Sequence, residues 1–284
     1  MRTVSGRAFA KLNLTLEVGD RRQDGYHPLV SVMTHISLSD EITLTREGED
    51  VCFESNASYL RCNDTNLCIR AAKKYFETSG VSPTGVKIKL KKIIPLKSGM
   101  GGGSADAALV IELMEQLFGK LSEEKRQSLA LSLGADVPFC LTKTPALCEG
   151  IGEIITPVSL SSKRVWVVVA KNAQKPSTAQ IYSEFDNSPV KFRGSHMDVI
   201  RALETGELSL YKKGMHNVFE DNVFASVPKA KMLSEQIAHL GAFAVQMTGA
   251  GPTVFGLFEK KEDAVSAVKA LRDRSTLAYF AYLV

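Results

Sequence analysis

The most constraining feature of the sequence is a run of glycines that opens directly into a helical pattern. The stretch reads IPLKSGMGGGSADAALVIELM from Ile94 to Met114, and four of the six positions from Gly99 to Ser104 are glycine. Glycine permits positive φ and lets backbone N–H groups approach a ligand without an intervening Cβ. A helix that starts beside such a loop adds unpaired N–H donors and a partial positive charge, so the pair favours phosphate binding.

This loop matches neither of two common nucleotide-binding patterns. No Gly-Lys-Ser/Thr follows it, so it is not a Walker A loop, and it does not fit G-x-G-x-x-G with a downstream acid. A tight strand–helix turn without a ligand stays open as an alternative, because glycine-rich turns are common. A second glycine loop, TGAGPT from Thr248 to Thr253, slightly strengthens the nucleotide interpretation.

Hydrophobic periodicity predicts a mixture of helices and strands without repeats or a low-complexity linker. Ser104 is expected to cap the helix that follows the first glycine loop. Other helices are expected at residues 66–78, 122–133, 178–186, 195–205, 217–225, 228–240 and 261–273. One or two strands are expected at 29–44, further strands at 4–18, 85–94, 164–170, 242–248, 253–258 and 276–283, and short strand-like pieces up to Pro157. The mixture predicts an α+β fold, arranged in two lobes.

Composition and charge argue against several classes of protein. The net charge is +4 over 284 residues, without a long basic run, so nucleic-acid binding is not expected, whereas an anionic small substrate is compatible. Five cysteines without a C-x-x-C pattern indicate free thiols in a reducing compartment rather than a zinc site or disulfides. No apolar run has membrane-spanning length and the first residues lack a signal-peptide core, so a cytoplasmic protein is expected.

Two charged residues stand out, although neither is decisive by itself. Lys11 lies inside the apolar stretch AFAKLNLTL, and alternation alone places its side chain on the solvent side of an edge strand. Asp136, in LGADVPF, is by itself more typical of a turn or a helix cap. The histidines have no ligand-like spacing with one another or with cysteine, so no metal centre is predicted.

Three segments together resemble the motifs of the GHMP kinase superfamily. They are AFAKLNLTLEVGDRRQDGYHPL, IPLKSGMGGGSADAA and MTGAGPTVFGLF, in this order along the chain. The pairing of AKLNL with DGYH, together with LGADVPF and EGIGE, is similar to the branch that acts on a cytidine diphosphate derivative of methylerythritol. The resemblance covers almost the whole chain. It implies an N-terminal lobe like ribosomal protein S5 domain 2 (residues 1–160) and a ferredoxin-like C-terminal lobe (residues 161–284), with the ligands between them.

The resemblance also implies an activity. The chain would use ATP to phosphorylate the 2-hydroxyl of the methylerythritol unit, giving the 2-phosphate and ADP in the non-mevalonate route to isoprenoids. Mg²⁺ would be held mainly through the ATP phosphates and water, with no protein metal ligand assigned. Small molecules would be its only partners, without nucleic acid or membrane, and the chain would be a monomer or a weak homodimer.

The matching positions carry roles that the resemblance implies. Asp136 would accept or orient the proton of the attacking hydroxyl, and Lys11 beside it would offset charge on the transferring group. Asn13 would hold substrate. ATP would be bound by Asn66 and Lys92 near the adenine, and by Pro95, Gly99, Gly101, Gly102, Gly103 and Ser104. The cytidine side of the substrate would be bound by Tyr26, His27, Thr178 and Tyr182, with Gly249 and Gly251 beside its diphosphate.

The first glycine loop departs from the family pattern at several positions. Ala105 replaces a second serine, and Lys97 and Met100 replace a small residue and a leucine. Lys97 could contact phosphate, but a solvent-facing side chain is the preferred interpretation. Asp106 could reach a magnesium ion, although an acid in a first helical turn is also ordinary stabilisation.

Three rival functions remain to be weighed. Another GHMP kinase, acting on mevalonate, phosphomevalonate or homoserine, would not need DGYH and Tyr182 to hold a nucleobase. An inactive ligand sensor would not need both Lys11 and Asp136. A nucleic-acid module has only fold analogy in its favour, and fold does not give function.

Overall fold

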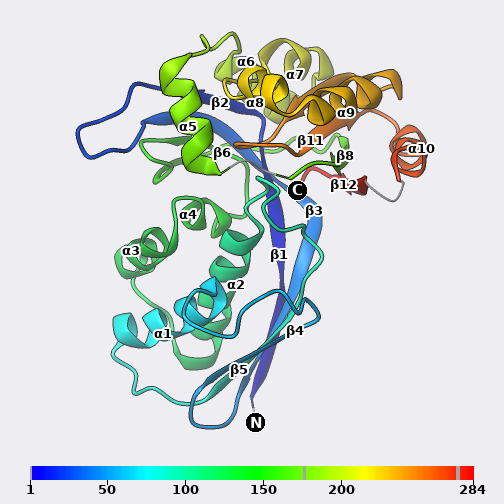
Figure 1. Cartoon of the computed structure of the whole chain (residues 1–284). Helices are drawn as coiled ribbons and strands as arrows, with labels where there is room; N and C mark the ends of the chain where they lie inside the picture. Colours follow the sequence, from blue (N-terminus) through cyan, green and yellow to red (C-terminus); the bar gives the residue numbers. More distant parts are fainter. Residues whose placement is uncertain (1, 175–176, 273–275) are drawn as a thin grey trace. The chain divides into compact units, whose positions relative to one another are not determined.

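The computed structural model describes residues 2–174, 177–272 and 276–284 (Figure 1). Its strands are β1 (Thr3–Asn13), β2 (Thr15–Val18), β3 (Leu29–Arg46), β4 (Val51–Ser55), β5 (Val86–Lys91), β6 (Ala146–Glu149), β7 (Ile154–Pro157), β8 (Trp166–Lys171), β9 (His216–Asn217), β10 (Ala244–Met247), β11 (Val254–Phe258) and β12 (Leu277–Tyr282). Its helices are α1 (Leu67–Ser79), α2 (Gly102–Phe118), α3 (Glu123–Leu133), α4 (Val137–Cys140), α5 (Thr178–Asn187), α6 (His196–Thr205), α7 (Leu208–Gly214), α8 (Glu220–Ser226), α9 (Pro228–His239) and α10 (Lys261–Leu271).

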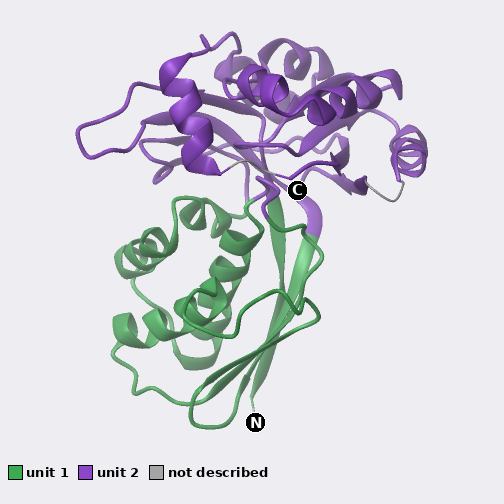
Figure 2. Ribbon diagram, in the orientation of Figure 1, with its two compact units in different colours: residues 1–10, 39–96, 101–143 green, residues 11–38, 97–100, 144–284 purple. Residues whose placement is uncertain are grey.

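The chain divides into two compact units, neither of which is continuous in sequence (Figure 2). Unit 1 consists of Met1–Ala10, Ser39–Leu96 and Gly101–Lys143, and unit 2 of Lys11–Leu38, Lys97–Met100 and Thr144–Val284. The chain passes from one unit to the other within β1, within β3 and within the first glycine loop. The expected division at residue 160 is a family-based boundary and stays a prediction.

Unit 1 packs three helices against one face of a sheet. β5 pairs antiparallel with the second half of β3 and parallel with β4. Apolar side chains alternate along β3 and β5, and they meet the buried faces of α1, α2 and α3 in one hydrophobic core. Small alanines near the start of α2 let this helix lie deep in the core, which fixes the place where the first glycine loop ends.

Unit 2 contains a second sheet with the strand order β10-β11-β8-β12, all antiparallel. Along the chain its elements follow as β8, α9, β10, β11, α10 and β12, which is the ferredoxin-like succession. Helices α9 and α10 bury their apolar faces on this sheet. Between β8 and α9 the chain inserts four further helices and β9, which pairs in parallel with β2.

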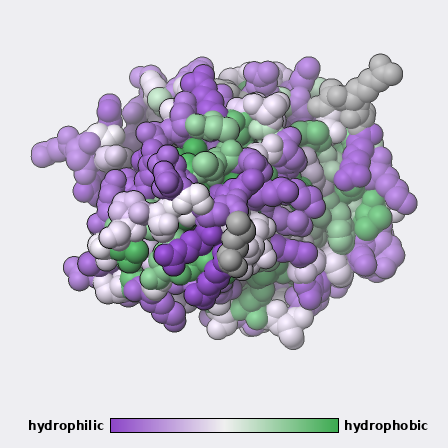
Figure 3. Space-filling model, turned by 90° about the horizontal axis from the view of Figure 1, so that it is seen from below, coloured by the Kyte–Doolittle hydropathy of each residue, from purple (hydrophilic) through white to green (hydrophobic). Residues whose placement is uncertain are grey.

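Most predicted elements are confirmed, because their periodicity is local. The apolar stretch at 29–44 forms one strand, β3. Strands β4 and β9 and the short helices α4 and α7 were not predicted, since each is too short to show a clear hydrophobic period. The face seen in Figure 3 is largely hydrophilic, with small separate hydrophobic areas. In the described ranges, no helix combines the length and apolarity needed to span a bilayer.

Candidate phosphate and substrate site

Unit 2 brings the end of β1 to the second glycine loop. Lys11 Nζ donates a hydrogen bond to Asn13 Oδ1 (2.8 Å), as expected of residues on one face of a strand. The backbone N–H of Asn13 donates to Thr248 Oγ1 (3.1 Å), and Asn13 Nδ2 donates to Ser31 Oγ (2.8 Å). Lys11 is only 4% exposed, so the placement on the solvent side by alternation is wrong. The hydrogen bond with Asn13 helps to offset the cost of burying the Lys11 ammonium.

The two glycine loops touch backbone to backbone inside unit 2. A Cβ on Gly99 would lie 2.6 Å from the carbonyl oxygen of Thr248, and one on Gly249 would lie 3.0 Å from the carbonyl oxygen of Gly99. Both glycines have positive φ, 74° and 56°. The N–H of Lys11 donates to the carbonyl of Met100 (3.0 Å), which ties the first loop to β1. Glycine is therefore needed here for conformation and for close approach.

Two side chains that the sequence analysis did not single out hold the second glycine loop. Asn217 Nδ2 donates to the carbonyls of Met247 (2.9 Å) and Gly249 (2.8 Å), and its Oδ1 accepts from the N–H of Phe219 (3.0 Å). Glu220 Oε2 accepts from the N–H of Met247 (2.7 Å). Burial raises the pKa of Glu220 to about 7. The loop that would face the substrate thus has a buried polar support.

The helix after the first glycine loop begins earlier than predicted. α2 starts at Gly102, and its N-cap is Gly101 in a left-handed conformation with φ 65°. Ser104 is therefore not the cap, as had been expected, but lies in the first turn, because only glycine readily adopts the conformation that starts the helix here. No side chain caps α2, so the N–H groups of Gly102, Gly103 and Ser104 have no capping side chain as a partner. This is the arrangement that suits an anion.

A buried charge cluster lies behind this helix start in unit 1. Lys92 Nζ contacts Asp40 Oδ2 (2.6 Å) and Asp106 Oδ2 (2.5 Å), and Asp40 Oδ1 also accepts from the N–H of Ile94 (2.8 Å). A Cβ on Gly102 would lie 3.1 Å from Lys92 Nζ. Burial, partly offset by the charge of Lys92, raises the pKa of Asp106 to about 7. The ammonium of Lys92, expected near adenine, is engaged by these two carboxylates.

Two other residues predicted to bind ATP, Asn66 near the adenine and Pro95, also lie in unit 1. Asn66 is the N-cap of α1: its Oδ1 accepts from the N–H of Cys68 (2.9 Å), and its Nδ2 donates to the carbonyl of Arg61 (3.1 Å). Pro95 is half-buried between β5 and the first glycine loop. Their contact with a nucleotide stays a prediction.

The residues predicted for the cytidine side gather in unit 2. His27 Nδ1 lies 2.9 Å from the carbonyl oxygen of Gly19, and Nε2 lies 3.4 Å from Asp186 Oδ1. The His27 and Tyr182 rings are 5.1 Å apart between centroids, although 155 positions separate them in sequence. Tyr26 is exposed, and Thr178 is the exposed first residue of α5. The structure thus brings His27 and Tyr182 together, whereas Tyr26 and Thr178 are exposed.

Asp136 belongs to unit 1. It occupies the N-cap position of the short helix α4, but its side chain makes no capping hydrogen bond. The interpretation as an ordinary capping aspartate is therefore not supported. Lys11 belongs to unit 2, and the pairing of these two side chains stays a prediction.

Family models and known relatives show to which protein family the chain belongs. The model of the GHMP kinases N terminal domain matches residues 66–144, and that of the GHMP kinases C terminal matches residues 199–275. A 4-diphosphocytidyl-2-C-methyl-D-erythritol kinase of Alkaliphilus metalliredigens is 37% identical over 95% of this chain and 93% of its own length. The chain belongs to this kinase family. A second relative of the same name, from Caldicellulosiruptor saccharolyticus, is also 37% identical, over 94% of the chain and 92% of its own.

Solved structures agree with this classification of the kinase. A crystal structure of 4-(cytidine 5'-diphospho)-2C-methyl-D-erythritol kinase aligns with a TM-score of 0.86 and 33% identity, covering 99% of each chain. A homoserine kinase from Cytophaga hutchinsonii aligns with a TM-score of 0.75 at 16% identity, which shows the shared fold alone. The two-lobed GHMP kinase fold expected from the motifs is thereby confirmed.

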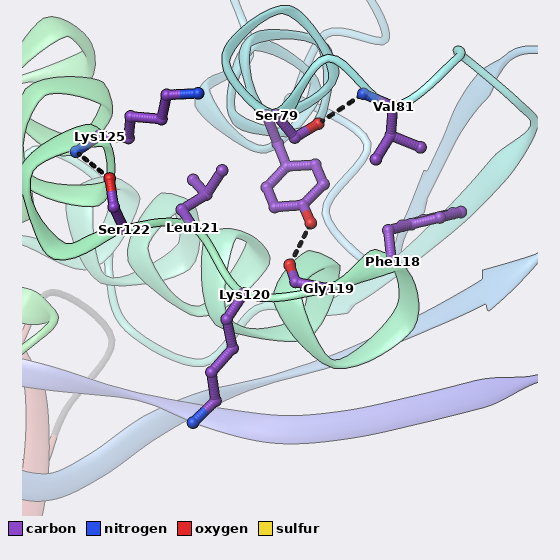
Figure 4. Close-up of a pocket in the computed structure, with 9 residues that line it drawn as sticks. Ser79, Val81, Phe118, Gly119, Lys120, Leu121, Ser122 and Lys125 are labelled. Carbon is purple, nitrogen blue, oxygen red and sulfur yellow. Dashed lines mark hydrogen bonds between the residues drawn. The ribbon is translucent and has the colours of Figure 1, made fainter.

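One hollow in unit 1 contains none of the predicted site residues. It measures about 310 Å³ and lies where α1 and α2 end and α3 begins, lined among others by Tyr75, Phe118, Lys120 and Lys125 (Figure 4). The Tyr75 hydroxyl donates to the carbonyl of Gly119 there. The other hydrogen bonds drawn at its walls in Figure 4 also join neighbouring residues, Ser79 with Val81 and Ser122 with Lys125. The hollow is therefore not assigned to the kinase reaction.

Asp40 is the missed residue that the sequence could have revealed. In SLSDEITL the apolar residues Leu38, Ile42 and Leu44 alternate, and Asp40 takes a position on their buried face. An acid at such a position needs a partner. Asn217 and Glu220 gave no comparable signal, because the loop that they support lies about thirty residues further along the chain.

Proposed function

We propose that this kinase transfers the γ-phosphoryl group of ATP to the 2-hydroxyl of 4-diphosphocytidyl-2-C-methyl-D-erythritol. The products are the 2-phosphate and ADP, in the non-mevalonate route to isoprenoid precursors. The names of relatives that match nearly the whole chain support the substrate. The gathering of Lys11, Asn13, Gly99 and Gly249 in unit 2 is the structural observation that carries the proposal.

Each part of the site has a role in phosphoryl transfer, which depends on positioning and charge neutralisation. The uncapped N–H groups at the start of α2 and the positive φ of Gly99 and Gly101 suit the ATP phosphates. Lys11 offsets charge as it develops on the transferring group, while Asn13 fixes the ammonium through Oδ1. Asp136 accepts or orients the proton of the attacking hydroxyl.

The cytidine end of the substrate is assigned to the side chains around His27. The Nδ1 contact with the Gly19 carbonyl fixes the ring, and Nε2, which lies 3.4 Å from Asp186 Oδ1, is the nitrogen that would exchange this contact for one with a base. Tyr182 packs against His27 on one side and Phe219 on the other, with centroids 4.8 Å apart in the second pair. Such an aromatic cluster suits a flat base, and a mevalonate or homoserine kinase has no base to hold.

Mg²⁺ fits this chain as an ion bound mainly through ATP oxygens and water. Among the described residues, no three histidines, cysteines or acids are grouped so as to hold a metal ion. The acid closest in sequence to the loop, Asp106, is turned toward Lys92. When bound, Mg²⁺ would neutralise phosphate charge.

We also propose a cytoplasmic location, the lobe boundary at residue 160, and a monomer or weak homodimer without nucleic-acid or membrane partners. Free thiols, which suit a reducing compartment, support the location. Sedimentation of the purified chain over a range of concentrations tests its oligomeric state.

The function is tested by ADP release with Mg-ATP and three separate acceptors: the cytidine compound, mevalonate and homoserine. Turnover is expected only with the first. Asp136→Asn and Lys11→Met should each lower kcat by about 10²-fold or more, the loss typical of a group acting in the transition state. Lys212→Met, an exposed change on α7, is the control. Turnover with another acceptor, or unchanged kcat in both variants, would refute the assignment.

A further inference from the structure

Lys97 and Lys171 lie at the point where the two glycine loops meet. Lys171 Nζ donates a hydrogen bond to the carbonyl oxygen of Lys97 (3.0 Å), and both residues belong to unit 2. Lys97 stands two positions before Gly99, whose backbone touches Thr248. Lys171 therefore connects the sheet of unit 2 to the start of the first glycine loop.

Sheet register places Lys171 beside the second glycine loop as well. Ala170 pairs with Val254, the first residue of β11, so Lys171 comes opposite the end of the loop that closes at Thr253. The last residue of β8 thus lies at the edge of the sheet from which this loop emerges. The backbone of Lys171 therefore lies beside the second loop, while its ammonium contacts the start of the first.

The backbone of Lys97 is unusual. Its φ is 49°, and it is the non-glycine residue with positive φ in the described ranges. A left-handed conformation is unfavourable for a residue with a side chain, and such conformations cluster at functional sites. A glycine would avoid this cost, so the lysine side chain at this position calls for a functional explanation.

The two ammonium groups also act on each other. Burial and, after it, the nearby charge of Lys97 lower the pKa of the Lys171 ammonium. Lys171 is half-buried and Lys97 is exposed. Like charges repel each other, and an anion bound beside them offsets the repulsion. The pair is therefore arranged as a site for negative charge.

We propose that Lys97 and Lys171 bind the polyphosphate chain of a nucleotide ligand where the two glycine loops meet. This assignment rests on the proposed kinase function and adds two cations to a cradle otherwise built from backbone. Lys97 is exposed, as expected of a solvent-facing side chain, and the proposal adds a ligand contact for it. The shared chemistry is a phosphoanhydride, which belongs either to the triphosphate of ATP or to the diphosphate of the acceptor.

Equilibrium binding separates these two sources. ADP represents the phosphate donor and CDP the diphosphate end of the acceptor, and calorimetry gives Kd for each with the whole chain. Lys171→Met and Lys97→Gly should each raise the Kd for one of the two ligands about tenfold, as expected for the loss of one charge-assisted contact. Loss for ADP alone assigns the pair to ATP, and loss for CDP alone assigns it to the acceptor.

Lys97→Gly also separates charge from backbone conformation. Glycine tolerates φ 49°, so the loop keeps its shape while the ammonium is lost. Lys97→Arg, which keeps the charge, should retain most of the affinity, and Lys212→Met on α7 should leave both Kd values unchanged. High salt should reduce the difference between wild type and Lys97→Gly, because ions screen an exposed contact.

The inference is overturned if Lys97→Gly and Lys171→Met both bind ADP and CDP within about twofold of the wild type. Failure of the kinase function would look different. In that case the wild-type chain would turn over none of the three acceptors, whereas the nucleotide affinities of the variants would still report on the lysine pair.

Discussion

Replacing Asp106 with asparagine should change how the stability of the kinase depends on pH. Asp106 is buried beside Lys92 and Asp40, and its Oδ1 has no hydrogen-bond partner. Two carboxylates share one ammonium, so full ionisation leaves an excess negative charge inside unit 1. Burial, which outweighs the attraction of Lys92, raises the pKa of Asp106 to about 7. The folded state therefore holds a proton that the unfolded chain releases.

The sign and size of the effect follow from proton linkage. Stabilisation by this proton is complete below the ordinary pKa of 3.8 and is lost as the pH rises through about 7. Each pKa unit corresponds to about 1.4 kcal/mol, so the two units between about pH 5 and pH 7 are worth roughly 2.5 kcal/mol. Asp106→Asn cannot titrate. Its free energy of unfolding relative to wild type should rise by that amount between about pH 5 and pH 8.

Urea unfolding followed by circular dichroism at several pH values measures the difference. Asp50→Asn, at an exposed carboxyl group in the same unit, serves as the matched control and should give a curve parallel to that of the wild type. Groups common to all three proteins cancel in the comparison. If Asp106→Asn also runs parallel to the wild type, Asp106 keeps its charge when folded, and the proton assigned to the cluster is refuted.

Two other features give independent tests. Asn217→Ala removes two donated hydrogen bonds and leaves the N–H of Phe219 unpaired, so chemical denaturation should show a loss of about 2–4 kcal/mol, together with a higher KM for the acceptor. Glu220→Gln keeps an acceptor for the second loop and should cost less than 1 kcal/mol near neutral pH; an equal loss in both variants would contradict this support role. Burial raises the pKa of the Cys68 thiol, so a disulfide reagent should label exposed Cys62 in the native chain and Cys68 only after unfolding.

Sequence reasoning succeeded where the determining interactions are local. The helix after the first glycine loop could be predicted from periodicity, and the ferredoxin-like succession from the family resemblance, whereas phosphate binding by the loop stays a prediction. The cap at Ser104 was wrong because Gly101, three residues earlier, adopts a left-handed conformation that no local pattern marks. The prediction that Lys11 faces solvent was wrong because its ammonium has a buried polar partner, Asn13. The backbone N–H of Asn13 is in turn bonded to Thr248, 235 positions away. Alternation cannot register such a partner.

The contact between the two glycine loops bears on how a kinase of this family could align its two ligands. In the proposed function, Gly99 binds the ATP phosphates and Gly249 the diphosphate of the acceptor. A Cβ on Gly99 would clash with the carbonyl oxygen of Thr248, and one on Gly249 would lie only 3.0 Å from the carbonyl oxygen of Gly99. A displacement of one loop must therefore move the other. Phosphoryl transfer depends on holding donor and acceptor in line. Asn217 supports the second glycine loop and Lys11 the first. In the proposed function, the contact between the two loops would therefore keep both ligands in a fixed relation to each other.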